Sequence, residues 1–167
     1  MRFSTVCCSI LLAANGGLIH VEAQQPSSAT REVSGATNPE LIPDDQALGS
    51  LFSRVGDGKG APPWESRIAF LRDSGLNDSK CEIVVNSANR YLSAFKAAQL
   101  RMDMARREKQ SPAAKQLLFS KDSQDLNRLW REVTESMATE LGKEDYDKLK
   151  SFVDRKIKPN LTLVVPQ

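Results

Sequence analysis

The sequence predicts an all-α fold: a long antiparallel helical hairpin with three shorter helices packed on it. Three observations lead to this fold class. Apolar residues from Cys81 to Met102 recur at alternating spacings of four and three, Ser111-Pro112 forms a helix start soon after, and glycine or proline bounds the other helical patterns. A connection this short makes two sequential helices antiparallel neighbours.

The first 23 residues have the pattern of a secretory signal peptide. Arg2 gives a positive n-region, Phe3 to Ala14 forms an apolar h-region, and Val21-Glu22-Ala23 offers small side chains at the two positions that a signal peptidase reads. A retained membrane anchor is the alternative, but a spanning helix needs about 20 apolar residues. We therefore expect cleavage after Ala23, a periplasmic or secreted product, and no integral membrane segment after processing.

Residues 24–40 are expected to form a disordered tether, because they are rich in polar and small residues and contain little apolar surface to bury. A helical domain is expected over residues 41–162, followed by a short C-terminal tail over residues 163–167. The mature chain of about 144 residues fits one domain.

Two short helices are expected first. The acidic residues of Pro43-Asp44-Asp45 suit a helix N-terminus, and the pattern ends at Gly56. Residues 56–63 form a loop whose glycine spacing differs from that of a phosphate-binding loop. Pro63 is expected just inside the start of the second helix, which stops at Gly75.

The third helix has the strongest pattern in the chain. Asn77 or Asp78 is a suitable cap, and nothing interrupts the pattern before Gln110, so the helix is about 30 residues and about 45 Å long. The apolar seam that we expect to face a neighbouring helix consists of Cys81, Val85, Ala88, Leu92, Phe95, Gln99 and Met102.

The fourth helix starts at Ser111 and is closed by Gly142. Its apolar face begins with Leu117 and Leu118, and the weaker pattern at residues 119–123 is compatible with a bend or a second cap. A last helix is expected from about Lys143 to Lys158, stopped by the following proline. The remaining apolar residues form an extended surface tail.

Processing limits the available chemistry. It removes the only histidine, His20, and two of the three cysteines, Cys7 and Cys8. Histidine-based catalysis and histidine metal sites then have no residues to use, so we expect no cofactor, no metal and no catalytic residue. Cys81 lies on the apolar seam and is expected to be a small buried thiol. A disulfide-linked dimer and a redox thiol are the alternatives.

A basic cluster near the C-terminal end of the third helix is the candidate partner-binding site. It consists of Arg101, Arg106, Arg107 and Lys109. Cations at this end of a helix also complement the helix dipole. No aromatic residues are interleaved with the cluster and the net charge is only +2, so we expect no nucleic-acid partner.

Two helix starts resemble each other. Leu76-Asn77-Asp78-Ser79-Lys80 opens the third helix and Leu141-Gly142-Lys143-Glu144-Asp145 opens the last. Both resemble a degraded form of the Leu-Thr-x-x-Gln pattern of Spy/CpxP-type periplasmic chaperones, although neither contains its threonine or glutamine. The sequences of residues 75–94 and 144–162 also resemble those of uncharacterised exported helical proteins of soil bacteria. The resemblance implies a small exported helical protein built round a hairpin, without cofactors.

These observations favour an exported helical interaction protein, with a periplasmic holdase or an envelope-stress accessory factor as the leading hypothesis. Its partner would be a protein or a non-native chain. Two alternatives stay open. One is a lyase or hydrolase that uses only carboxylates, lysines or arginines, and the other is a structural subunit of an envelope assembly.

The signal-peptide pattern generates the first prediction. N-terminal sequencing of the native protein is expected to find Gln24 as the first residue, because signal peptidase cleaves after Ala23. Recovery of the chain from the cytoplasm with Met1 intact would contradict it.

Overall fold

The computed structural model describes residues 30–58, 60–108 and 111–166 and confirms the all-α fold class. The predicted signal peptide and residues 24–29 of the predicted tether lie outside these residues. The helices are α1 (Asp44–Val55), α2 (Trp64–Arg72), α3 (Asp78–Arg107), α4 (Pro112–Leu141) and α5 (Lys143–Phe152), and the strands are β1 (Thr30–Ser34) and β2 (Thr162–Pro166). Short 3-10 helices cover Pro39–Leu41 and Lys158–Asn160, and a π-helical turn covers Val153–Ile157.

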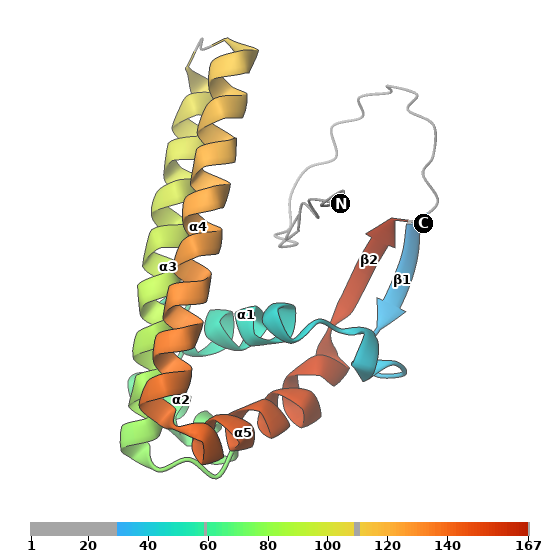
Figure 1. The fold of residues 1–167 in the computed structure, drawn as a ribbon, viewed down its shortest axis with the longest axis vertical. Coiled ribbons are helices and arrows are strands. Elements are labelled where there is room, and N and C mark those ends of the chain that lie inside the picture. The colour runs from blue at the N-terminus through green and yellow to red at the C-terminus, as the bar shows by residue number, and fades with distance from the viewer. Residues whose placement is uncertain (1–29, 59, 109–110, 167) are drawn as a thin grey trace.

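The hairpin of α3 and α4 is the longest feature of the molecule (Figure 1). Its helices begin as expected: the Asn77 side chain accepts a hydrogen bond from the backbone N–H of Lys80 at 3.0 Å, and Ser111 Oγ accepts one from the N–H of Ala114 at 3.2 Å. Each helix has 30 residues. Helix α4 is continuous from Pro112 to Leu141, so no second cap occurs at residues 119–123.

The hydrophobic core lies at only one end of this hairpin, where α1, α2 and α5 pack against it (Figure 1). Phe52 of α1 is fully buried there, with its ring 5.3 Å from Trp130 and 6.4 Å from Tyr91. The residues of α3 and α4 in this core are Cys81, Val84, Val85, Ala88, Val133, Met137 and Leu141. We call this end the base of the hairpin and the opposite end its tip.

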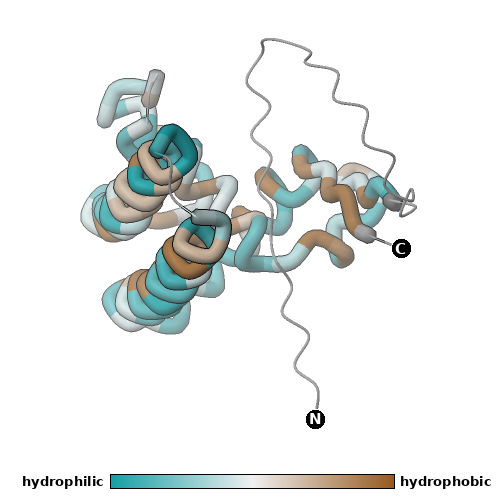
Figure 2. The backbone as a smooth tube through the Cα atoms, turned by 90° about the horizontal axis from the view of Figure 1, so that it is seen from above, coloured by the Kyte–Doolittle hydropathy of each residue, from teal (hydrophilic) through white to brown (hydrophobic). Residues whose placement is uncertain are grey.

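Burial is thin above the base. Within the described residues, the fully buried apolar positions of α3 beyond Ala88 are Ala98 and Ala105. Leu92 and Phe95, which lie on the predicted seam, are only half-buried. Figure 2 looks along the hairpin and shows its two helices next to each other, away from the C-terminal segment.

The loop after α1 is held against α3. The backbone N–H of Asp57 donates to Asn89 Oδ1 at 2.6 Å, and the ammonium of Lys96 donates to the carbonyl of Asp57. The buried guanidinium of Arg67 donates to the carbonyl of Val55 at 3.2 Å and to Asp57 Oδ1 at 2.5 Å. The prediction of a loop here is confirmed, although Pro63 precedes α2 as its N-cap and does not lie inside the helix.

The prediction of a disordered tether over residues 24–40 is wrong for residues 30–40. Residues 30–34 form β1, which pairs with β2 in antiparallel register, with Val33 buried opposite Leu163. The expected C-terminal tail is therefore mostly the strand β2, which forms the backbone hydrogen bonds with β1. Gly35 follows β1 and approaches Lys158 so closely that a Cβ atom would lie 1.8 Å from the Lys158 carbonyl oxygen.

The last predicted helix, from about Lys143 to Lys158, has the expected extent, but it changes its helix type along the way. Helix α5 ends at Phe152, and the π-helical turn and the 3-10 helix carry the chain on to Asn160. Gly142 separates α4 from α5 at a φ of 77°, a conformation that favours glycine.

The location of the core generates the second prediction. Phe52→Ala is expected to lower the free energy of unfolding by about 3–5 kcal/mol, because it leaves a cavity among fully buried neighbours. Leu117→Ala, at an exposed position of the hairpin, is the control and is expected to change it by about 0.5 kcal/mol or less. Urea unfolding followed by circular dichroism measures both, and equal effects would contradict the proposed core.

Candidate functional site

The predicted basic cluster is divided between two surfaces of the hairpin. Arg101 turns toward α4, where its Nη2 and Nε donate to Asp122 Oδ1 at 2.7 and 3.2 Å. Arg106 and Arg107 lie in the last turn of α3 at the tip. Lys109 lies outside the described residues. The structure therefore does not bring the described members of this cluster together as one site.

The two tip arginines have different surroundings. Arg106 pairs with Asp103 one turn earlier, at 3.2 Å, and its guanidinium lies 5.9 Å from the ring centre of Phe119. Arg107 is exposed. Lys115 reaches across from α4 to the carbonyl of Arg106 at 3.5 Å, which satisfies a backbone acceptor at the end of α3.

Apolar side chains accompany these cations at the tip. Leu100 is 63% exposed, Met104 52% and Leu117 73%. The sequence pattern placed Leu117 at the start of a buried face, but no other described element reaches this part of α4 to cover it. We call these three residues, with Arg106, Arg107, Lys115 and Lys121, the tip surface. Exposed large apolar side chains are typical of interaction sites where they adjoin one another. Leu100 and Met104 are one helical turn apart on α3 and therefore lie on the same face of that helix.

A second surface lies on the flank of the hairpin, where a shallow groove of about 440 Å³ runs between α3 and α4. Its lining residues are Ala94, Arg101, Asp122, Asp125, Leu126, Arg128, Leu129 and Glu132. Arg128 pairs with Asp125 at 3.0 Å, and Arg90 lies 3.8 Å from Glu132. The rim of the groove is therefore a set of ion pairs.

Asp122 differs from the other charged residues of the hairpin because it is only 4% exposed. Its Oδ1 accepts both hydrogen bonds from Arg101, while its Oδ2 is buried and accepts none from the described residues. No prediction from the sequence included this carboxylate. A signal was present, since Asp122 lies between Phe119 and Leu126 at spacings of three and four, as a seam residue does.

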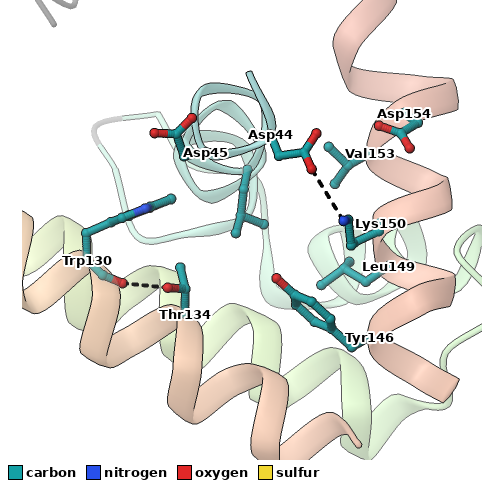
Figure 3. Close-up of a pocket in the computed structure, with 10 residues that line it drawn as sticks. Asp44, Asp45, Trp130, Thr134, Tyr146, Leu149, Lys150, Val153 and Asp154 are labelled. Carbon is teal, nitrogen blue, oxygen red and sulfur yellow. Dashed lines mark hydrogen bonds and ion pairs between the residues drawn. The ribbon is translucent and has the colours of Figure 1, made fainter. Parts of the chain in front are cut away.

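A pocket of about 200 Å³ lies at the base, between α1, α4 and α5 (Figure 3). Asp44, Asp45 and Asp154 contribute carboxylates to it, and Tyr146 and Trp130 contribute aromatic rings. An enzyme that uses carboxylates, the alternative function, would need a group of acidic side chains of this kind.

Two of the three carboxylates of this pocket, Asp44 and Asp154, are engaged in ion pairs. The Lys158 ammonium is buried and bonds Asp44 at 2.5 Å and Asp154 at 2.8 Å, and Lys150 lies 3.3 Å from Asp44. The hydrogen bond from Lys158 lowers the pKa of Asp44, and the hydrogen bonds with Asp154 and Asp44 raise the pKa of Lys158. A general acid needs a raised carboxyl pKa. The cluster instead ties α1 to the C-terminal segment.

The described residues contain no group of three or more His, Cys, Asp or Glu side chains arranged to hold a metal ion. Among the same residues, no helix has the length and apolar character needed to span a membrane. Comparison with protein-family models, curated proteins and solved structures finds no match to this chain.

Cys81 generates the third prediction. The thiol is fully buried, and desolvation raises its pKa to about 11. A thiol reagent is therefore expected to leave the folded mature chain unmodified at pH 8 and to react with one thiol per chain after unfolding in urea, since the thiolate is the reactive form. Cys81→Ser is the control for background reaction. Fast modification of the folded protein at pH 8 would favour the redox or disulfide alternatives.

Proposed function

We propose that this protein is an exported interaction protein whose hairpin tip binds apolar segments of other polypeptides. The observation that carries the proposal is the tip surface, where Leu100 and Met104 of α3 and Leu117 of α4 are each more than half exposed, on two helices that the base holds in place. A periplasmic holdase or an envelope-stress accessory factor is the activity of this kind that we favour. The signal-peptide pattern of residues 1–23 supports the location.

The charge of the tip adds to the description of the bound segment. Residues 102–108 and 112–121 contain four Lys and Arg residues and only two acidic residues. Cationic groups around apolar contacts favour a client whose apolar residues are flanked by Asp or Glu, because complementary charges speed association and select partners. The long aliphatic stems of lysine and arginine also cover apolar surface.

The alternative of a carboxylate lyase or hydrolase has weaker support. The base pocket holds Asp44 and Asp154 in ion pairs with Lys158, and a lowered pKa keeps Asp44 ionised, so it does not serve as a proton donor near neutral pH. A structural subunit of an envelope assembly would use the same hairpin surfaces and differs in having one permanent partner.

The fourth prediction tests the tip surface. The triple variant Leu100→Ser, Met104→Ser, Leu117→Ser is expected to require at least about fivefold more protein than the wild type to suppress aggregation of reduced, unfolded α-lactalbumin, because burial of apolar area drives such binding. Light scattering measures the aggregation. Circular dichroism is expected to show an unchanged fold, since the three side chains are exposed.

The matched control is the double variant Leu41→Ser, Val164→Ser, which removes two exposed apolar side chains far from the hairpin tip. It is expected to suppress aggregation as the wild type does. Absence of suppression by the wild type, or equal losses in the two variants, would refute the proposed function.

A further inference from the structure

The flank groove has a property that the tip surface lacks: it contains an incomplete polar site. Asp122 is buried, yet Oδ2 has no donor among the described residues. Arg101 is committed to the other oxygen, at 2.7 and 3.2 Å. A buried carboxylate oxygen is normally hydrogen-bonded, so the groove is suited to a partner that brings an N–H group to this point.

The charges on the rim indicate which partner this is. Arg90, Arg101 and Arg128 pair with Glu132, Asp122 and Asp125, so these six residues of the flank have no net charge. A surface of this kind becomes complementary to itself when the two-fold axis of a dimer sets the arginines of one copy opposite the carboxylates of the other. The tip surface has an excess of positive charge and would repel its own copy.

The helix surface beside the groove permits close approach. Arg90, Ala94, Ala97 and Arg101 follow one another on α3 at spacings of four, three and four, which places them along one stripe. The two alanines leave room for a neighbouring helix, and Leu126 and Leu129, both half-buried, line the groove beside them. Side chains as small as alanine let a helix pair approach to the short end of the range of interaxial distances, about 8–10 Å.

We infer that the flank groove is a self-association surface, in which two copies of this chain pack hairpin against hairpin and an arginine of each copy donates to Asp122 Oδ2 of the other. Arg128 is the donor that fits best. Its side chain is exposed, it lies on the groove, and a guanidinium carries five N–H donors. Asp122 Oδ2 is buried in the single chain, so docking requires the solvent-exposed side chain of Arg101 to move aside at the rim. The donating Arg128 has to leave its own partner, Asp125.

The stripe is short, and this sets the expected strength of the dimer. From Arg90 to Arg101 it extends about 17 Å at about 1.5 Å per residue. Contacts of this size belong to the small class of transient interfaces. The dimer is therefore reversible, with a dissociation constant on the order of micromolar.

Sedimentation velocity of the purified protein from about 1 to 300 µM, a range set by the expected affinity, tests the inference. The wild type is expected to pass from monomer to dimer. Arg128→Glu and Ala97→Glu are each expected to raise the dissociation constant at least about tenfold, because they place a like charge or a buried charge in the interface. Arg131→Glu makes the same charge change on an exposed position of α4 outside the groove, and is expected to leave association unchanged.

The variant Asp122→Leu distinguishes two roles for Asp122. One is a contact between two copies of the chain, and the other is an ion pair that only aligns α3 with α4 within one chain. The expected result is a dissociation constant raised at least about tenfold with a monomer melting temperature that is unchanged or higher, because replacing a buried ion pair by an apolar residue often stabilises a protein. Unchanged dimerisation of this variant would overturn the role of Asp122.

A wild type that stays monomeric throughout the concentration range, or a dimer that Arg128→Glu and Ala97→Glu leave intact, would overturn the inference. The triple tip variant is expected to dimerise normally. The self-association of the flank and the client binding of the tip therefore succeed or fail independently.

Discussion

The structure depends on a difference in length between the hairpin and the helices that cover it. Helices α3 and α4 have 30 residues each, whereas α1, α2 and α5 have 12, 9 and 10. At about 1.5 Å per residue, the hairpin is about 45 Å long and the longest covering helix about 18 Å. The covering helices therefore enclose a core at the base only. Above the base, the two helices of the hairpin extend without the covering helices (Figure 1). Apolar side chains there, such as Leu100, Met104 and Leu117, are exposed to solvent.

The contact between α3 and α4 above the base contributes little to the stability of the fold. Ala98 and Ala105 are its fully buried apolar residues within the described chain, and alanine removes little surface from water. Asp122 adds a cost, because a buried polar atom without a partner loses about 1–3 kcal/mol of hydration. Stability in a protein varies from region to region, and here it is concentrated around Phe52. The hairpin above the base thus has little stability to spare, and the buried carboxylate of Asp122 lowers it further. A recognition role for Asp122, as proposed for the flank groove, would offset this cost.

The sequence was sufficient for features that local chemistry decides. Asparagine and serine are residue types that favour the N-cap position, and Asn77 and Ser111 do cap α3 and α4. Gly142 ends α4, as its residue type predicts. It was insufficient where a partner distant in the chain decides. β1 forms because residues 162–166 pair with it, and the composition of residues 24–40 gives no sign of this pairing. Periodicity likewise identified the face that contains Leu117, but the exposure of a face depends on whether another element reaches it, which periodicity does not encode.

The predicted basic cluster identified the location of a proposed binding surface only in part, for the same reason. Its positions were evident from the sequence, but the register between α3 and α4 decides that Arg101 meets Asp122 while Arg106 and Arg107 stay at the tip. This division gives the two surfaces opposite electrostatic properties. The tip is positively charged around exposed apolar groups, which opposes self-association and favours acidic chains. The flank is balanced in charge and contains the unsatisfied oxygen. One hairpin can therefore join a second copy by its flank and keep its tip available for other polypeptides.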